Sequence, residues 1–285
     1  MLETLDHLVI VVRDLAASTE TLARLLGRRP SWRGVHPSYG TANTLFRLDN
    51  IYVELLAAQA RGPIADKVED RLARHGDGLF ALCFRTDDAP ACARELRARG
   101  LHVDDPADGS GREATTGAER RWRSFALSEA QTRGVFVLVI EHRSPPALLP
   151  LAPPQQEARA AISACDHVVV QSSDADAASA LYGGGLGLRL ALDKTFPEWG
   201  ARLLFFRIGG ITVEIASPLD ERPADAADRL WGISYRVPDL EAARARLASQ
   251  GFDVSEVRAG RKPQTRVCTV RGEPCGVATL LITHD

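Results

Sequence analysis

Two pairs of histidine and glutamate stand out in this chain because they recur at one fixed spacing. His7 and His167 are 160 residues apart (167 minus 7), and Glu54 and Glu214 are also 160 residues apart (214 minus 54). Imidazole and carboxylate groups bind divalent metal ions and transfer protons near neutral pH. An early histidine and a late glutamate in each copy therefore indicate a duplicated unit equipped for metal binding or for acid–base chemistry.

These glutamates lie within apolar strands, as does Glu141, which ends a strand of its own. An unpaired carboxylate among apolar side chains is costly, so each needs a compensating cation. A divalent metal ion is one candidate for that cation. A neighbouring arginine or histidine is the other. Arg47 and Arg207 lie on the hairpin strands next to Glu54 and Glu214, and His7 and His167 could be strand histidines that hydrogen-bond to a carboxylate.

Hydrophobic periodicity predicts the elements that position these residues. An apolar strand over residues 6–12 is followed by a helix that begins after Asp14 and ends at Gly27. Three more strands are expected near residues 32–35, 41–48 and 51–57. The unit thus reads β-α-β-β-β, with His7 on its first strand and Glu54 on its last. Alternation along a strand lets both side chains face one side of the sheet.

The second quarter of the chain repeats this order. Its strands and helix are expected at residues 79–85, 89–99, 122–127 and 134–141. The segment 104–120 is rich in Gly, Asp and Thr, and we expect a mobile, exposed loop there that could act as a lid. The last quarter mirrors the second, since Arg85 and Arg236 and their neighbours correspond at a spacing of 151 residues (236 minus 85).

The fold class predicted from these repeats is α+β, with four βαβββ modules paired into two domains. The domains are expected at residues 1–143 and 161–285, joined by a Pro-rich linker at 144–160. A βαβββ unit covers only one face of its sheet with a helix, so two units must pair and enclose a trough. The pattern leaves open whether modules pair within each domain or across the linker.

Composition limits the partners of the protein. The 285 residues carry 35 Lys and Arg against 37 Asp and Glu, a net charge of -2 without a basic run, so nucleic acid is not expected as a partner. The five cysteines contain no C-x-x-C pair, and the N-terminus carries no secretory signal, which favours a cytoplasmic protein. We expect no membrane partner and, without a phosphate loop or dinucleotide fingerprint, no nucleotide cofactor. The chain is expected to be a monomer or a homodimer.

Three segments of the sequence resemble one known superfamily. The segments LDHLVIVVRDL at 5–15, IYVELL at 51–56 and GLFALCFRTDD at 78–88 are similar to motifs of the vicinal oxygen chelate superfamily. This is the group of glyoxalases, bleomycin-resistance proteins and extradiol dioxygenases, and the resemblance covers nearly the whole chain. It implies two tandem glyoxalase-type domains, each with a trough for a small-molecule ligand.

The resemblance also implies a divalent ion, such as Ni, Zn, Mn, Fe or Mg, that chelates two adjacent substrate oxygens. Carried over by position, its ligands are His7, Glu54 and Glu141, with His167 and Glu214 as a second and weaker set. Glu54 and Glu141 are then also the candidate catalytic bases. The histidine slot of the second module holds Ala81, and the matching slot of the fourth module holds Gly232, so neither pair of modules supplies a second histidine.

Four further residues are candidate substrate contacts. His36 and Asn43 have no counterpart in the second copy, which indicates either polar contacts to a substrate or the capping of a loop. Trp199 and Trp231 are candidates for an apolar pocket in the second domain, or are part of its core. His142 and His284 follow strand ends and are expected to be solvated.

The sequence supports one leading function and two alternatives. The first is a divalent-metal-dependent lyase or isomerase that acts on a small oxygenated organic substrate. The second is a metal-free protein that binds or sequesters a small molecule in an aromatic-lined pocket. The third is an extradiol-type dioxygenase, which needs two histidines and one glutamate around Fe(II) and is therefore the least compatible with Ala81.

Overall fold

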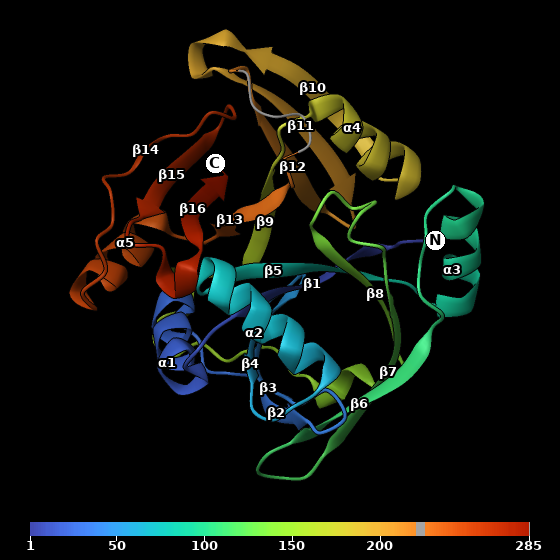
Figure 1. The fold of residues 1–285 in the computed structure, drawn as a ribbon. Helices are drawn as coiled ribbons and strands as arrows, with labels where there is room; N and C mark the ends of the chain where they lie inside the picture. The colour runs from blue at the N-terminus through green and yellow to red at the C-terminus, as the bar shows by residue number, and fades with distance from the viewer. Residues whose placement is uncertain (221–225, 285) are drawn as a thin grey trace.

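The structure is a computed structural model that describes residues 1–220 and 226–284. Two β-sheets, one from each half of the chain, are covered by helices and pack against each other (Figure 1). This arrangement confirms the predicted α+β class and the βαβββ modules. Within the described residues, no helix is long and apolar enough to span a membrane.

The first half of the chain forms a closed barrel of eight strands with three helices on its outside. In chain order its elements are β1 (Thr4–Val11), α1 (Leu15–Leu26), β2 (Trp32–His36), β3 (Thr41–Arg47), β4 (Tyr52–Ala58), α2 (Pro63–His75), β5 (Gly78–Arg85), α3 (Ala89–Ala98), β6 (Ala107–Glu113), β7 (Glu119–Ala126) and β8 (Phe136–His142).

Helix α1 shows how local sequence sets these boundaries. Asp14 is its N-cap, and the carboxylate accepts a hydrogen bond from the backbone N–H of Ala17. Gly27 ends the helix in the left-handed conformation at φ 64°, where its N–H donates to the carbonyl of Ala23. Helix α2, by contrast, has no counterpart in the sequence prediction.

The barrel closes because the first and second modules pair along two seams. β1 runs parallel to β4 and antiparallel to β5, so that strands of both modules meet at β1. β2 pairs with β6 on the opposite side, through Gly34 and Glu113. Modules therefore pair within the first half of the chain, which settles a choice that the sequence leaves open.

The expectation of a mobile, exposed loop at residues 104–120 is wrong. The segment contains β6 and the start of β7, which form an antiparallel hairpin in the barrel wall. This strand is unusually rich in glycine, and its surroundings require small residues. A Cβ at Gly109 would lie 2.5 Å from Nε1 of Trp122, and a Cβ at Gly111 would lie 2.8 Å from the ring of His36. The glycines therefore make room for side chains of the neighbouring strands.

The second half of the chain forms an open sheet of eight strands in the order β10-β11-β12-β9-β13-β16-β15-β14. Its elements, with the short helical turns η1 to η5, are η1 (Pro146–Leu148), η2 (Ala158–Ala160), β9 (Ala164–Gln171), α4 (Ala175–Ser179), η3 (Ala180–Gly185), β10 (Arg189–Phe196), η4 (Pro197–Trp199), β11 (Ala201–Ile208), β12 (Ile211–Pro218), β13 (Arg229–Arg236), α5 (Leu240–Ser249), β14 (Arg258–Ala259), β15 (Thr265–Val270), η5 (Pro274–Gly276) and β16 (Ala278–His284).

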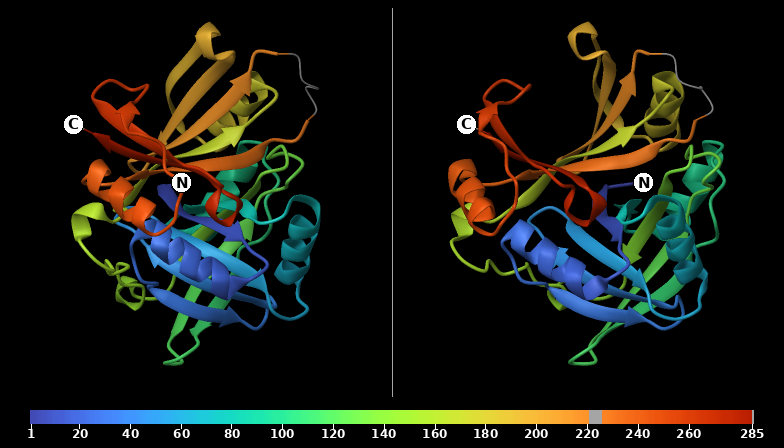
Figure 2. Two further views of the ribbon diagram at one scale, coloured as in Figure 1. Left: turned by 90° about the vertical axis from the view of Figure 1, so that its left-hand side faces the viewer. Right: turned by 60° about the vertical axis from the view of Figure 1, so that its left-hand side comes forward.

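A continuous hydrophobic core joins the two halves. Leu8 and Ile10 on the outer face of β1 belong to the same cluster of buried residues as Val168 and Val170 on β9. Helices α1 and α5 lie side by side at this interface (Figure 2). The guanidinium group of Arg246 on α5 donates 2.9 Å to the carbonyl of Leu25 and thereby satisfies the end of α1. The inner face of the barrel is left free to hold a ligand.

Candidate functional site

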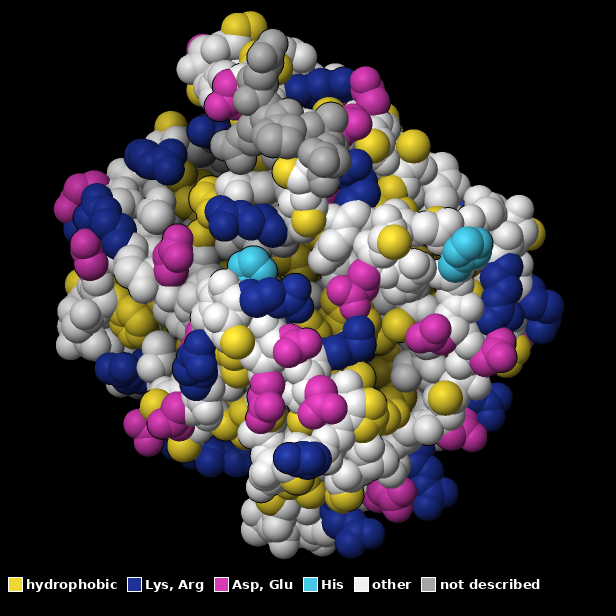
Figure 3. Space-filling view, in the orientation of Figure 1, with side chains coloured by type: hydrophobic (Ala, Val, Ile, Leu, Met, Phe, Trp, Pro, Cys, Tyr) yellow, Lys and Arg dark blue, Asp and Glu magenta, His cyan; other side chains and the backbone are white. Residues whose placement is uncertain are grey.

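The interior of the barrel is a cavity of about 480 Å³. Such a volume suits a small organic molecule. On the face seen in Figure 3 the molecule is hollowed between charged side chains, and hydrophobic side chains line the hollow. The polar or ionisable residues that line the cavity wall are His7, His36, Tyr39, Thr41, Asn43, Tyr52, Glu54, Lys67, Cys83, Asp104, Asp105, Arg120, Trp122, Ser124, Ser128 and Glu129.

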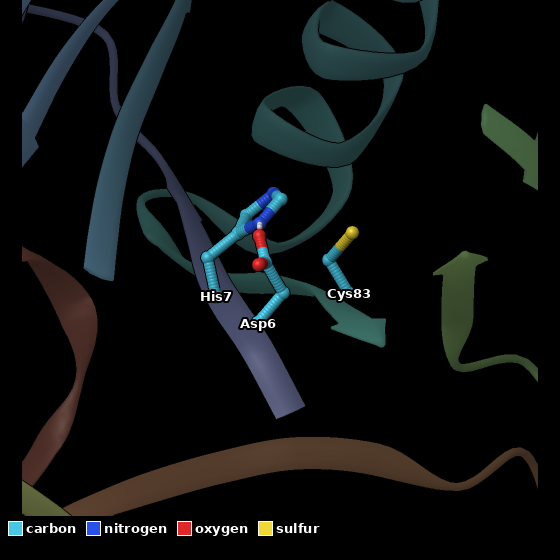
Figure 4. Close-up of side chains that lie close together, drawn as sticks. All are labelled: Asp6, His7 and Cys83. Atoms are coloured by element: carbon cyan, nitrogen blue, oxygen red, sulfur yellow. Dashed lines mark hydrogen bonds and ion pairs between the residues drawn. The ribbon is translucent and has the colours of Figure 1, made fainter. Parts of the chain in front are cut away.

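His7 projects into this cavity from β1 together with Val9, as strand alternation predicts. A bulge in the pairing of β1 with β5 falls between Leu5 and His7, so Asp6 has no direct partner on β5. The bulge brings the Asp6 carboxylate to the imidazole, and Nδ1 of His7 donates to Oδ2 of Asp6 over 2.7 Å (Figure 4). In the neutral ring, the lone pair is then on the remaining nitrogen, Nε2.

Glu54 faces His7 from the adjacent strand β4. Its Oε2 lies 3.5 Å from Nε2 of His7, and its Oε1 accepts a hydrogen bond of 2.8 Å from Nδ2 of Asn43. Both side chains are almost completely buried. The ring of Tyr52 stacks on that of His7, with centroids 4.3 Å apart, and restricts the imidazole further. Asn43 thus holds one carboxylate oxygen of Glu54, and the other oxygen is directed at His7.

Asn43 and His36 extend this contact into a hydrogen-bonded chain. The amide Nδ2 of Asn43 lies 3.3 Å from Nε2 of His36, and Nδ1 of His36 lies 3.0 Å from Oγ1 of Thr41. Burial lowers the pKa of His36, although the Glu54 carboxylate opposes the shift. A neutral His36 can accept from Asn43 and donate to Thr41, so these residues hold the glutamate in place.

The opposed atoms of His7 and Glu54 cannot stay as they are without a positive charge between them. A carboxylate oxygen and an imidazole lone pair at 3.5 Å repel each other unless a proton or a cation bridges them. Two ligand atoms of one ion with bonds of roughly 2.1 Å lie at about this separation. The pair therefore fits a divalent cation, with the open cavity supplying the other coordination positions.

Asp6 also binds a second histidine. Nε2 of His142, at the end of β8, donates 2.9 Å to Oδ1 of Asp6. Burial alone would raise the pKa of Asp6, but the hydrogen bonds from His142 and His7 outweigh it and hold the pKa well below its ordinary value. Asp6 thus stays ionised and links β1 to β8. The expectation that His142 is simply solvated is wrong.

Cys83 is a further candidate ligand that the sequence did not single out. It lies opposite His7 on β5 and lines the cavity. Three potential ligand atoms lie within 4.8 Å of one another, one each from Asp6, His7 and Cys83. The three side chains point to the same side of the sheet (Figure 4). Burial raises the pKa of the thiol well above its ordinary value, so Cys83 is protonated unless a metal displaces the proton.

The second half of the chain repeats the same side-chain arrangement in the open sheet. Nδ1 of His167 lies 2.9 Å from Asp166, Nε2 of His167 lies 3.6 Å from Glu214, and Nε2 of His284 lies 2.8 Å from Asp166. Arg236 adds an ion pair of 2.8 Å to Asp166. His284 therefore occupies the place that His142 has in the barrel.

The second copy differs in how the glutamate is held. Leu203 stands where the repeat places Asn43 (43 plus 160), so Glu214 has no amide donor from that position. Burial raises the pKa of Glu214, while the charges of His167 and Arg261 oppose the shift. The open sheet therefore holds its glutamate less firmly than the barrel does, so this copy is less suited to a metal ion than the barrel site.

Glu141 does not join His7 and Glu54. It lies on the outer face of β8, where Oε2 accepts a hydrogen bond of 3.0 Å from the backbone N–H of Ala89 and Oε1 pairs with Arg143 at 3.1 Å. Its assignment as a metal ligand and base is corrected on this geometry, because it caps the start of α3 instead. The alternation along β8 turns His142 inward and Glu141 outward.

The other sequence candidates also lie away from the cavity. Trp199 stacks on Phe196 at the tip of the β10–β11 hairpin and is 37% exposed, and Trp231 on β13 is 42% exposed. The aromatic lining predicted for the second domain belongs to the first instead, where Trp122 faces the cavity. Arg47 does not pair with Glu54, since its guanidinium group donates to the carbonyl of Pro146 over 3.2 Å.

The closed barrel, the open sheet and the paired histidine and glutamate define a protein with two vicinal oxygen chelate domains. The profile of a family described as "Glyoxalase-like domain" matches residues 5–162, and that of the "Glyoxalase/Bleomycin resistance protein/Dioxygenase superfamily" matches residues 166–269. The chain belongs to the glyoxalase-like family of this superfamily, as the sequence motifs predict.

Individual relatives agree with this assignment. An ethylmalonyl-CoA/methylmalonyl-CoA epimerase of Cereibacter sphaeroides is 30% identical over 100 residues, which cover 33% of this chain and 75% of the relative. A mutant 4-hydroxymandelate synthase of Streptomyces coelicolor is 16% identical, with a TM-score of 0.74 over 100% of this chain and 94% of its own. A hypothetical protein of Staphylococcus aureus is 12% identical, with a TM-score of 0.67 over 97% and 98%. These structures share the fold.

Proposed function

We propose that the barrel cavity is the active site of a lyase or isomerase that acts on a small oxygenated organic molecule and depends on a divalent cation. The observation that carries the proposal is the pair of atoms Nε2 of His7 and Oε2 of Glu54, which converge at 3.5 Å on the wall of the barrel cavity. Together they would hold the cation. When bound, such an ion stabilises negative charge that develops on a substrate oxygen.

The residues of the chain divide the remaining work. Asp6 accepts the proton of Nδ1 in a hydrogen bond, so that Nε2 of the neutral imidazole would be the nitrogen that binds the cation. Asn43 holds Oε1 of Glu54, so Oε2 would leave the cation when it accepts a proton from a substrate carbon next to a carbonyl group. The side chains of His7 and Glu54 are almost completely buried in the barrel wall, which strengthens these electrostatic contacts. The name of the curated relative, an epimerase, describes an isomerisation and favours this reaction class.

A metal-free binding function is the second candidate. The apolar part of the cavity wall favours it, because Phe80 and Phe136 pack against each other there, with ring centroids 5.0 Å apart. A protein of this kind would retain its ligand after treatment with a chelator. Turnover that requires a cation would set the two functions apart.

Deuterium exchange tests the proposal with simple carbonyl compounds in place of the natural substrate. A panel of small α-hydroxyketones and 2-oxo acids in D₂O, followed by proton NMR, reports removal of a proton next to a carbonyl. We expect exchange that requires an added divalent cation and falls at least about 100-fold in Glu54→Gln. The matched variant Glu214→Gln should exchange at the wild-type rate. Equal exchange by wild type and Glu54→Gln, or none with any cation, would contradict the proposal.

A further inference from the structure

Three arginines lie close together on β7, and they differ in their partners. Arg121 and Arg123 point outward, where Arg121 pairs with Glu119 at 3.1 Å and Arg123 pairs with Asp108 at 2.7 Å. Arg120 points inward and lines the cavity with only 9% of its surface exposed. Alternation along the strand separates the three, so the inward residue cannot reach the carboxylates that its neighbours use.

Arg120 is surrounded by aromatic rings. Its guanidinium carbon lies 5.5 Å from the ring centroid of Trp32 and 5.7 Å from that of Tyr52. Within residues 1–220 and 226–284, no carboxylate lies at ion-pairing distance from it. Cation–π contacts offset only part of the cost of burying a cation. The guanidinium group is therefore placed for a partner that the described residues do not provide.

The other basic side chain on the cavity wall is already neutralised. Lys67 lies at the edge of the cavity, 48% of its side chain is exposed, and its Nζ pairs with Glu129 at 2.8 Å. Asp105, an acidic group of the wall, pairs with Arg97 at 2.7 Å. Glu54 is held by Asn43 and faces His7. Arg120 alone among these charged groups lacks an opposite charge from the described chain.

Tyr52 contacts both Arg120 and the reactive pair. Its ring centroid lies 5.7 Å from the guanidinium carbon of Arg120, and its ring stacks on that of His7. The charge of Arg120 acts on the pKa values of both Tyr52 and His36, in each case as a smaller contribution than burial. Arg120 and the His7–Glu54 pair thus face the same cavity.

We propose that Arg120 binds a carboxylate of the ligand, so that the cavity selects small organic anions over neutral analogues of the same shape. The forked guanidinium group matches the two oxygens of a carboxylate, and the burial of Arg120 strengthens that contact. The apolar lining around Phe80 and Phe136 receives the hydrocarbon part of the same molecule. This assignment rests on the proposed function in one respect: it names the substrate class of the cavity that we propose as the active site.

A pair of matched probes tests the assignment by binding alone. Titration calorimetry at pH 7.5 would compare 3-phenylpropanoate with 3-phenylpropanamide, which has nearly the same shape but no charge. Wild type should bind the acid at least tenfold more tightly than the amide. Arg120→Met should remove this preference, and the neighbouring variant Arg121→Met should keep it.

The outcomes separate this inference from the proposed function. Wild type that binds both probes equally, or neither, overturns the role of Arg120, as does a preference for the acid that survives in Arg120→Met. Because Arg120→Met removes a buried cation, we expect its melting temperature to equal or exceed that of wild type. The comparison of acid and amide in wild type tests the inference even if this variant does not fold. Loss of exchange activity in Glu54→Gln is independent of these results, since it concerns proton removal and not ligand charge.

Discussion

Asp6 determines what His7 can do, although it does not line the cavity itself. Its two carboxylate oxygens accept from His7 and His142, so that one buried charge orients two imidazoles from different strands. The same arrangement at Asp166 has an additional ion pair with Arg236. A buried carboxylate with two charge-assisted hydrogen bonds stabilises the fold only while it is ionised.

Replacement of Asp6 by asparagine should therefore cost stability in a pH-dependent way. The pKa of Asp6 is lower in the folded protein than its ordinary value near 3.9, so its stabilising contribution is complete well above that pH and declines as the pH falls below it. We expect Asp6→Asn to lower the free energy of unfolding by about 3 kcal/mol at pH 7, and by about 1 kcal/mol less at pH 3. Urea denaturation at both pH values measures the difference.

The exposed pair of Asp105 and Arg97 offers the control for that experiment. Asp105→Asn should change the free energy of unfolding by less than about 1 kcal/mol at either pH, since surface ion pairs contribute little. An equal loss for Asp6→Asn at pH 7 and pH 3 would show that its carboxylate is not held in the ionised form.

At the residue scale, strand alternation predicted His7 and Glu54 on the cavity face correctly. It missed Asp6, because a bulge in β1 turns that residue toward the histidine and a bulge leaves no mark in the pattern of apolar residues. It also chose Glu141 where His142 is the inward residue. That error follows from alternation, because a shift of one residue moves a side chain to the other face of the sheet.

At the element scale, β6 shows why glycine-rich sequence is a poor guide to flexibility. Its composition predicts a loop, but its glycines pack against Trp122 and His36 within the barrel wall. Strand propensity describes side chains on an ordinary pleated surface, and it does not register a strand whose place is determined by large neighbours. Without β6 the barrel would stay open on that side.

A methyl group at Gly109 should disturb both the wall and the cavity. Its Cβ would lie 2.5 Å from Nε1 of Trp122 and 2.6 Å from the hydroxyl of Tyr39, so the indole must move. We expect Gly109→Ala to lower the free energy of unfolding by about 1 to 3 kcal/mol and to weaken binding of 3-phenylpropanoate. Gly184→Ala is the control, because a Cβ there meets no atom within 4 Å. A Gly109→Ala variant as stable as Gly184→Ala would contradict this packing.

At the scale of the whole molecule, the duplicated sequence forms two different sheets, one closed into a barrel and one open. The repeat predicts four similar modules, and the structure contains them. It does not predict that the first two close into a barrel through β2 and β6 while β10 and β14 remain the edges of an open sheet. That difference depends on contacts between strands far apart in sequence, to which a local pattern is insensitive.

The unequal sheets imply unequal sites. The barrel encloses its histidine and glutamate and holds the glutamate through Asn43, whereas the open sheet has Leu203 at that position and a Glu214 whose pKa is raised by burial. We therefore expect one divalent cation per chain, bound in the first half. Two copies of a motif need not mean two working sites.

The metal content of the purified protein decides whether His7 and Glu54 hold a cation. After incubation with a divalent cation and removal of the excess, elemental analysis should find about one ion per chain in wild type and in Glu214→Gln, and close to none in His7→Gln and Glu54→Gln. An ion that persists in Glu54→Gln but is lost in Glu214→Gln, or wild-type protein that retains no divalent ion, would contradict a cation held between His7 and Glu54.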